Sequence, residues 1–488
     1  MARTGGDGAL FEVGEGSGPF RPRVPAGAAK TFRRYDQAQS FLLPPSLDDW
    51  LPEAHEARFI SEVVEELLDL SVIYDSYVMA DGAPPYEPRM MLKLLLYGYS
   101  IGVTSSREIE RRCGLDVAFR WLAANAAPDY RSISRFRRRH LDALDELFVQ
   151  VLALCAEAGL VKLGRVALDG TKLRASASKH KAMSYDRLGP KIALLEAEVA
   201  AILAEAEAAD RAEDEAFGAD RRGDEVPDEL ARRATRIEKM RAAKEAIEAD
   251  ARDKAAEKAA KKARREDKSE DEIAEAAARA GEKATPEGRT QRSFTDPEAR
   301  MMKTNDGFQY AYNAQAVVDE TSQVIIAVEV TQQASDVDQL ISMLEVMADT
   351  LEDTGIEDTP DVVLADAGYC SEANLDDLVE AEVDALIATG RIRRGERVPP
   401  APRGRMPKTL TRREKMARRL RTKAGRADYA RRKAIVEPAF GQMKVRQRAG
   451  QLRLRGLEGA TGEWTIHTLC HNLRKLAKVT PLGPIGVA

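Results

Sequence analysis

An apolar run ends in an acid at Val166-Ala-Leu-Asp-Gly-Thr-Lys172. The pattern predicts a strand over residues 161–168 that leads into Asp169. A second run, Val362-Val-Leu-Ala-Asp-Ala-Gly-Tyr369, has the same form and places Asp366 directly after a buried strand. An acid at the end of an apolar strand points out of a buried sheet, where a metal ion can reach it. The two acids are therefore candidates for one site.

A third acid, Glu437, lies in Ile435-Val-Glu-Pro-Ala-Phe-Gly-Gln-Met-Lys444. Carboxylate oxygens suit hard cations, so Asp169, Asp366 and Glu437 suggest a site for two Mg²⁺ or Mn²⁺ ions. Two such ions can activate a nucleophile and stabilise the leaving oxygen of an in-line displacement. Without metal the carboxylates repel one another, so at least one pKa should rise. Any one of these acids alone would be explained as an ordinary strand-end or surface residue. All three in this order favour a catalytic site.

The bulk composition allows two or three domains with buried cores in 488 residues. No apolar run approaches the ~20 residues of a membrane span. The first thirty residues lack a signal-peptide pattern, and the four cysteines are far apart and lack zinc-finger spacing. We expect a cytoplasmic, nucleoid-associated protein without a membrane partner. No Gly-Lys-Ser/Thr phosphate loop is present in the sequence, so we expect no nucleotide cofactor.

Charge is unevenly distributed along the chain, although the formal net charge is only −5. From Arg391 to Arg455 there are 23 Lys and Arg residues against 4 Asp and Glu residues. A field of that sign raises association with polyanions whatever the total charge. We therefore predict that this basic tract contacts the DNA backbone. The arginines chosen to represent it are Arg412, Arg413, Arg418 and Arg419.

Residues 41–160 are predicted to form a helical domain that follows a flexible tail at residues 1–40. Apolar residues recur at helical spacing between Phe59 and Val72. Further helices are expected at 88–99, with Pro88 in the first turn, at 105–113, capped by Ser105 and Glu108, at 132–140 and at 141–158. Short helices with a basic member resemble a helix-turn-helix layout, which favours DNA contact. An all-helical dimerisation or packing domain with a solvated arginine face is the alternative.

Residues 185–290 are rich in Ala, Glu, Lys, Arg and Asp and contain almost no aromatic residues. Gly223 and Pro227 divide them into two helical arms. The composition predicts a helical hairpin or coiled-coil-like insertion. Partial disorder is the alternative, because such a chain buries little apolar area.

The remaining segments, 161–184 and 291–478, are predicted to form one sheet-containing domain before a C-terminal tail at 479–488. After the first strand come a hairpin of 307–318 with 323–330, a helix capped by Ser335 or Asp336, a buried strand at 361–365 and a strand at 383–388. A helix is expected from Tyr429 to Val445, with Pro438 kinking it or marking its first turn. Three antiparallel strands and two crossovers give a mixed five-stranded sheet, so the fold class is α/β, or α+β overall.

This strand order is the ribonuclease H-like order, and the motifs make the match narrower. The chain resembles bacterial insertion-sequence transposases of the DDE type over residues 40–180 and 290–478. The matching motifs are Asp169-Gly-Thr-Lys172, Asp366-Ala-Gly-Tyr369, the Tyr-Arg-Glu-Lys signature at Tyr429, Arg432, Glu437 and Lys444, and the helical block from Pro88 to His140. No one motif is decisive, but their order and strand contexts together are specific.

The resemblance implies metal-dependent cleavage and strand transfer of double-stranded DNA, at the terminal inverted repeats of an element and at a target. It implies a homodimer when assembled on DNA. The catalytic and metal-binding residues would be Asp169, Asp366 and Glu437. The DNA-binding residues would be those of the basic tract together with Lys172, Tyr429, Arg432, Lys433 and Lys444.

The signature departs from its usual form at the arginine. Three residues normally separate the arginine from the glutamate, but Arg432 lies one residue further back, and Lys433 occupies the expected place. Either side chain could carry the positive charge. Glu437 and Lys444 are seven residues apart, about two helical turns, so both should face the same side.

Three other interpretations remain open at this point. The chain could be an inactive transposase relic that still binds DNA, a ribonuclease H-like nuclease without transposition activity, or a structural protein built around the charged insertion. His467 and His471 have a spacing that permits zinc, but an apolar helical stripe around them favours core packing.

Overall fold

The computed structural model describes residues 46–77, 84–178, 182–217, 228–266, 268–304, 306–390 and 400–480. It divides into a short unit, Met1–Ser46, and a large unit, Leu47–Ala488, which contains every element described below. Four sequence predictions fall outside the described residues. These are the tail at 1–40, nearly all of the tail at 479–488, the divider at Gly223 and Pro227, and the part of the basic tract at 391–399.

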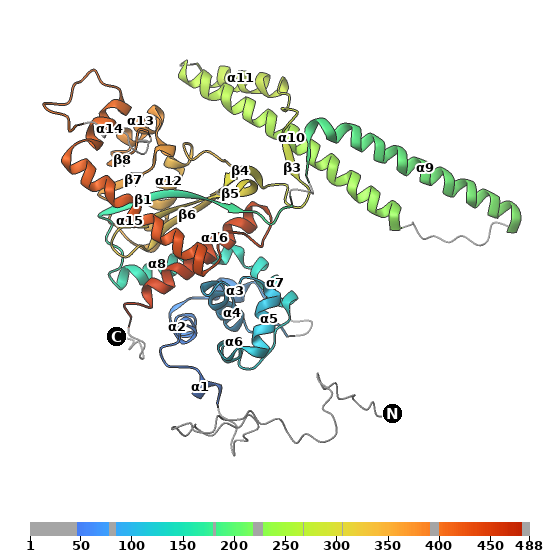
Figure 1. Ribbon diagram of the computed structural model, residues 1–488, viewed down its shortest axis with the longest axis horizontal. Coiled ribbons are helices and arrows are strands. Elements are labelled where there is room, and N and C mark those ends of the chain that lie inside the picture. Colours follow the sequence, from blue (N-terminus) through green and yellow to red (C-terminus); the bar gives the residue numbers. More distant parts are fainter. Residues whose placement is uncertain are drawn as a thin grey trace, which may run out of the picture. The chain divides into compact units, whose positions relative to one another are not determined.

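The first part of the large unit is helical, as predicted (Figure 1). Its helices are α1 (Leu47–Trp50), α2 (Glu56–Glu62), a π-helical turn (Val63–Leu67), α3 (Ser71–Asp75), α4 (Pro88–Ser100), α5 (Ser106–Leu115), α6 (Val117–Leu122), α7 (Tyr130–Arg139) and α8 (Leu141–Glu157). Helix α6 was not predicted, because six residues are too few for a helical period to show. Ser105 precedes α5 but makes no side-chain cap, since Glu108 bonds to Arg111 instead.

The sheet has six strands rather than the five predicted. They are β1 (Arg165–Arg174), β4 (Arg300–Thr304), β5 (Gly307–Asp319), β6 (Ile325–Thr331), β7 (Val362–Ala365) and β8 (Ala385–Ile387). Strand β5 pairs with β1 along one edge and with β4 and then β6 along the other, all antiparallel. Strands β1, β7 and β8 are parallel neighbours. The mixed order is confirmed. The additional strand β4 and a small sheet of β2 (Ala182–Ser184) with β3 (Gln291–Ser293) were not predicted.

Strand β1 lies four residues further along the chain than its predicted start. The Asp319 carboxylate accepts the N–H groups of Lys162 (3.3 Å) and Leu163 (3.0 Å), and Leu163 has a positive φ of 53°, so the chain turns before the strand begins. Pairing with β5 then continues from Val166 to Arg174. Asp169 therefore lies inside the strand and not at its end, which corrects the sequence prediction.

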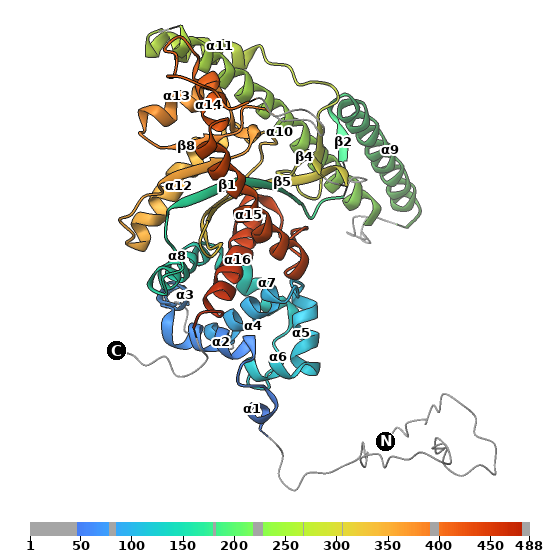
Figure 2. The same ribbon diagram turned by 60° about the vertical axis from the view of Figure 1, so that its left-hand side comes forward.

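Helices cover both faces of the sheet. The other helices of this domain are α12 (Gln339–Thr354), α13 (Glu372–Glu380), α14 (Arg412–Leu420), α15 (Lys423–Arg446) and α16 (Gly456–Leu476). Figure 2 shows α15 and α16 beside β1. The Trp464 indole of α16 is buried and donates to the Gln315 carbonyl of β5 (3.1 Å). On α12, Ser342 donates to Glu329 of β6 (3.1 Å). Helix α15 begins before the predicted Tyr429, so Pro438 lies inside it and not in its first turn.

The charged insertion is helical, with α9 (Tyr185–Phe217), α10 (Asp228–Arg265) and a third helix, α11 (Glu270–Glu282), that was not predicted. Helices α9 and α10 share a small core of their own, formed by Leu188, Ile192, Leu195, Ile237, Met240 and Ile247. Asp250 of α10 forms ion pairs with Arg292 of β3 (3.3 Å) and with Arg300 of β4 (3.0 Å). The insertion is thereby attached to the strands at its base.

His467 and His471 lie on the buried side of α16, which agrees with the interpretation that they serve core packing. Both imidazoles are buried, and they bond to different partners. Nδ1 of His467 contacts Gln447 Oε1 (3.0 Å), whereas Nε2 of His471 contacts the Gln323 carbonyl (2.8 Å). Burial lowers the pKa of His467 to about 3 and that of His471 to about 4.

These two histidines should make stability depend on pH. Their folded-state pKa values lie below the ordinary 6.5, so unfolding takes up protons and stability is lost as pH falls from about 6.5 toward 4. Each should contribute about 1.4 kcal/mol per pH unit in that window. Urea unfolding at a series of pH values should show this slope, and His467→Gln should reduce it by close to one proton. An unchanged slope in His467→Gln would contradict the assignment.

Candidate active site

Asp169 and Asp366 are neighbours in the sheet. Strand β1 is parallel to β7, and Leu168 pairs with Ala365. The residue that follows each member of this pair is an aspartate, Asp169 in β1 and Asp366 after β7. Adjacent strands lie ~4.8 Å apart. The sheet register therefore brings the first two predicted acids together without any contribution from loops.

Asp169 is held on both of its carboxylate oxygens. Oδ1 accepts the N–H of Gly170 (2.9 Å), and Oδ2 accepts Nη1 of Arg432 from α15 (2.9 Å). Burial raises the pKa of Asp169, the Arg432 guanidinium lowers it, and the Asp366 carboxylate raises it, with a net upward shift. The site thus contains the repulsion between carboxylates that a bound cation would relieve.

Asp366 follows strand β7 at its carboxyl end. Its side chain accepts the N–H of Gly368 (2.6 Å) and caps the 3₁₀ turn Ala367–Tyr369. The motif Asp-Ala-Gly-Tyr therefore forms a capped turn that fixes the carboxylate beside β1. Tyr369 is buried below this turn, and its hydroxyl donates to the Gln315 side chain.

Glu437 lies on α15, the helix that faces Asp169, but its side chain is exposed. Among the residues that the structure describes, no group of three His, Cys, Asp or Glu side chains is close enough to hold a metal ion. The structure thus brings two of the three predicted acids together and leaves the third on the adjoining helix.

The other signature residues differ in how they contact β1. Arg432 bonds to Asp169 as described, and Tyr429 is half-buried next to it. Lys444 is exposed overall, but its ammonium donates to the Thr171 hydroxyl on the Asp169 face of β1. Burial lowers the pKa of Lys444, while Asp169 raises it. Lys433 is exposed, so the arginine one residue before the expected position is the one that reaches the acid.

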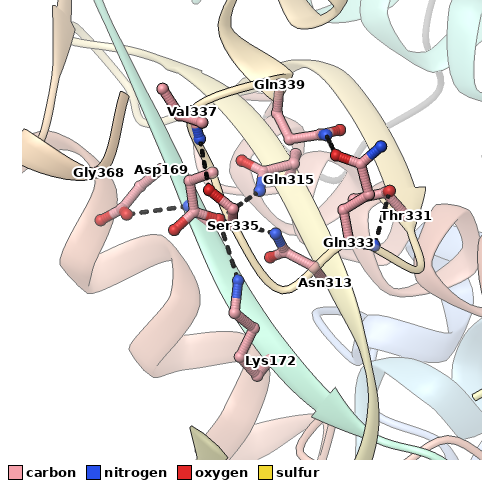
Figure 3. A network of polar contacts seen from close by, with 12 residues as sticks. Asp169, Lys172, Asn313, Gln315, Thr331, Gln333, Ser335, Val337, Gln339 and Gly368 are labelled. Atoms are coloured by element: carbon pink, nitrogen blue, oxygen red, sulfur yellow. Dashed lines mark hydrogen bonds and ion pairs between the residues drawn. The ribbon is translucent and has the colours of Figure 1, made fainter. Parts of the chain in front are cut away.

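A second polar network lies on the opposite face of β1, where Lys172 points. The carboxylate of Asp336 accepts Lys172 Nζ (3.0 Å), Asn313 Nδ2 (2.7 Å) and Gln315 Nε2 (3.0 Å). Figure 3 shows the side chains of Lys172, Asn313 and Gln315 converging there. Lys172, predicted to bind DNA, is therefore ion-paired within the protein and on the other side of the strand from Asp169.

Asp336 is a residue whose place the sequence analysis missed, since it was considered only as a helix cap. Helix α12 begins at Gln339, and its N-cap makes no side-chain bond. A signal was present in strand β5, where Asn313 and Gln315 point to one face of an otherwise apolar strand. Both are fully buried, and buried amides need partners. The two amides indicate that a polar partner lies near this face, but not that the partner is an acid.

The representative arginines of the basic tract contact neighbouring parts of the protein. Arg412 pairs with Asp376 (2.7 Å), and Arg419 pairs with Asp384 through Nη2 and Oδ2 (2.6 Å). Arg413 donates to the Thr389 carbonyl (2.6 Å), and Arg418 donates to the Arg403 carbonyl (2.7 Å). These contacts attach α14 to the sheet. Exposed pairs of this kind are weak, so they leave the side chains able to exchange partners.

Comparison with protein families identifies two matches in the chain. Residues 45–139 match a transposase domain of the DUF772 family, and residues 283–473 match a transposase DDE domain. Together they cover more than half of the chain and agree with the helical domain and with the sheet. The chain belongs to the insertion-sequence transposases of the DDE type. None of the curated proteins or solved structures compared with it matches.

The DDE match includes Asp366, the signature residues of α15, and Asp336 with its partners Asn313 and Gln315, whereas Asp169 and Lys172 precede it. The placement of Asp169 beside Asp366 thus comes from the β1–β7 register and not from the match. No described helix has the length and apolar character needed to cross a membrane.

The Asp336 network explains the glycine that follows the first acid. A Cβ at Gly170 would lie 2.5 Å from Gln315 Nε2 and 3.0 Å from Asp336 Oδ1, both of which are held by hydrogen bonds. Gly170→Ala should therefore destabilise the transposase by about 1–3 kcal/mol, measured by chemical denaturation. Gly114→Ala is the matched control, because a Cβ there meets nothing within 4 Å. Equal stability of the two variants would show that the Asp336 network accommodates the added methyl group without destabilising the protein.

Proposed function

We propose that this transposase binds the ends of its element and cleaves and joins DNA at Asp169 and Asp366, with Glu437 as the third acid. The observation that carries the proposal is the β1–β7 register, which sets the two aspartates side by side under α15. The same helix carries Glu437, Arg432, which bonds to Asp169, and Lys444, which bonds to Thr171 on the same face of β1. Acids and phosphate-binding groups thus meet at one place.

The residues present fit a divalent cation. Asp169 and Asp366 offer oxygen ligands of the type that Mg²⁺ and Mn²⁺ prefer. Burial, and to a smaller extent the Asp366 carboxylate, raise the pKa of Asp169, and a positive ion between the two acids would offset both effects. Bound there, the metal would supply Lewis acidity for phosphodiester chemistry. Glu437 would join from α15.

The chain's own side chains would position the DNA. Arg432 is a two-pronged donor suited to phosphate oxygens, and Lys444 is a point charge on the same face of β1 as Asp169. Tyr429 lies against Arg432 and limits where the guanidinium can move. The three would hold the phosphates next to the cleaved bond.

The proposed partners are the terminal inverted repeats and a target duplex. We propose a homodimer on DNA, since two element ends must be brought together, and action in the cytoplasm at the nucleoid. The retained acids support an active enzyme over a relic that only binds.

Single substitutions of the acids test this function. Asp169→Asn, Asp366→Asn and Glu437→Gln should each abolish metal-dependent nicking of a terminal-repeat duplex, because the amide keeps the shape but loses the charge that holds the cation. DNA binding should remain nearly intact. Asp361→Asn, an exposed acid at the start of β7, is the control. If a variant nicks at the normal rate, the substituted residue does not belong to the catalytic site.

The contact between Arg432 and Asp169 predicts which signature cation matters. Arg432→Ala should reduce cleavage and strand transfer by two or more orders of magnitude, as is typical when a preorganised charge at the reacting group is removed. Lys433→Ala should leave both rates close to those of the unmodified protein, because Arg432 is the cation of this pair that bonds to Asp169. Arg432→Lys should be impaired despite its charge. Loss of activity in Lys433→Ala with normal activity in Arg432→Ala would reverse the assignment.

A further inference from the structure

A pocket of about 400 Å³ lies between helix α7 and the segment that leads into α16. Four arginines line it, two from each side, and the pocket is called the arginine pocket below. Arg137 and Arg138 come from the end of α7, and Arg453 and Arg455 come from the segment before α16. Arg453 and Arg455 lie at the end of the basic tract, whereas Arg137 and Arg138 lie outside it, and none of the four is among the arginines chosen to represent the tract.

The positive charges of the arginine pocket outnumber the acids around it, which are Glu458 in the lining and the buried Glu463 behind it. Within the described ranges, none of its arginines forms an ion pair. Arg138 donates to the Ser134 carbonyl (3.3 Å), Arg453 to the Thr104 hydroxyl (3.4 Å) and Arg455 to the Ser176 carbonyl (3.2 Å). These acceptors are neutral. Glu458 is the one carboxylate among the lining residues, so the pocket keeps an excess of positive charge.

A buried acid fixes one wall of the pocket. Glu463 is fully buried, and its Oε2 accepts the backbone N–H groups of Arg453 (2.6 Å) and Leu454 (2.8 Å). Its Oε1 accepts the Tyr99 hydroxyl (3.1 Å), which in turn accepts Nη1 of Arg137 (2.7 Å). Both walls are therefore tied to one carboxylate, and the pocket is formed before any ligand arrives.

Arg137 is the buried member of the arginine pocket. Only 6% of this residue is exposed, and its Nε is buried without a hydrogen-bond partner. That nitrogen has almost no accessible surface, and Nη1 is bonded to Tyr99 and to the Thr104 carbonyl (3.0 Å), so Arg137 adds its charge to the pocket. The exposed arginines, Arg138, Arg453 and Arg455, are the side chains that can reach a ligand. Arginine donors and surplus positive charge together select a ligand with anionic oxygens, and the guanidinium fork matches phosphate.

We propose that the arginine pocket binds a backbone phosphate of the DNA duplex, at a distance from the cleaved bond. This inference rests on the proposed function for the identity of the duplex. The contrast with α14 supports the choice, because Arg412 and Arg419 already have carboxylate partners, whereas the arginines of the pocket have none. Phosphate can bind in the pocket without breaking an ion pair.

The geometry of β1 sets the position of that phosphate. Ser176, on the wall of the pocket, follows Asp169 by seven residues along β1 and its continuation. An extended chain rises ~3.3 Å per residue, so the two lie at most ~23 Å apart. A duplex advances ~3.4 Å per base pair. The bound phosphate should therefore lie up to about seven base pairs from the cleaved bond.

The test uses the full-length protein with Arg138→Gln, Arg453→Gln and Arg455→Gln combined. All three side chains are exposed, so the fold should persist. The salt dependence of binding to a fluorescent duplex of arbitrary sequence should become shallower by roughly two to three units of log K against log [salt]. Arg135→Gln is the matched control on α7, since Arg135 is exposed but does not line the pocket, and it should leave the slope unchanged.

A second measurement locates the contact. Single neutral methylphosphonates placed along a terminal-repeat duplex should weaken binding of the unmodified protein at one position within about seven base pairs of the cleaved bond. The triple variant should be insensitive at that position alone. An unchanged salt slope in the triple variant, or an equal loss in Arg135→Gln, would overturn the proposal.

The two proposals fail in different ways. If the unmodified protein does not cleave terminal-repeat DNA, the proposed function fails, but the salt slope on the arbitrary duplex still measures the pocket. If cleavage occurs and the triple variant binds with an unchanged slope, only the pocket is wrong.

Discussion

The pairing of β1 with β5 is the constraint on which the rest of the site depends. It holds β1 in a register where Asp169 and Thr171 face α15, while Gly170 and Lys172 face the Asp336 network. A shift of one residue would exchange the two faces, because side chains alternate along a strand. The acid would then point at α12, and Lys172 at α15. The long antiparallel pairing of β1 with β5 therefore determines which side chains face the active site, and no single side-chain contact has an equal effect.

The Asp336 network reinforces that register from the far side of the sheet. It connects β1 through Lys172 and β5 through Asn313 and Gln315, and the turn after β7 joins it through Tyr369, whose hydroxyl donates to Gln315. The ion pair of Lys172 with Asp336 is partly buried and contributes little to stability by itself, because desolvation offsets the attraction. Here its geometry matters more than its energy, since it fixes the strands that carry both aspartates.

Much of this arrangement could be predicted from the sequence, and the remainder depended on contacts that periodicity does not encode. Strand β7, the hairpin of β5 with β6 and helix α4 were predicted because their apolar patterns are long and regular. The end of β1 was misplaced, because β5 supplies a pairing partner beyond the apolar run. The short strands β2, β3 and β4 are polar or brief and give no pattern. The partners of Lys172 and Arg419 lie far away in the chain, so their ion pairs were invisible until the fold was known.

The small sheet of β2 and β3 has a consequence for how the protein folds. Strands β1 and β5 can pair only after the chain closes a loop of well over a hundred residues, because the insertion lies between Arg174 and Ala311. Pairing of Ser184 with Gln291 joins the two ends of the insertion. Once the helical insertion has formed on its own core, the loop left to close is about five times shorter. The entropic contribution to the free energy of loop closure then falls by roughly 1.5 kcal/mol. A large insertion in the middle of a catalytic sheet is thus compatible with rapid folding, provided that it folds first and brings its own ends together.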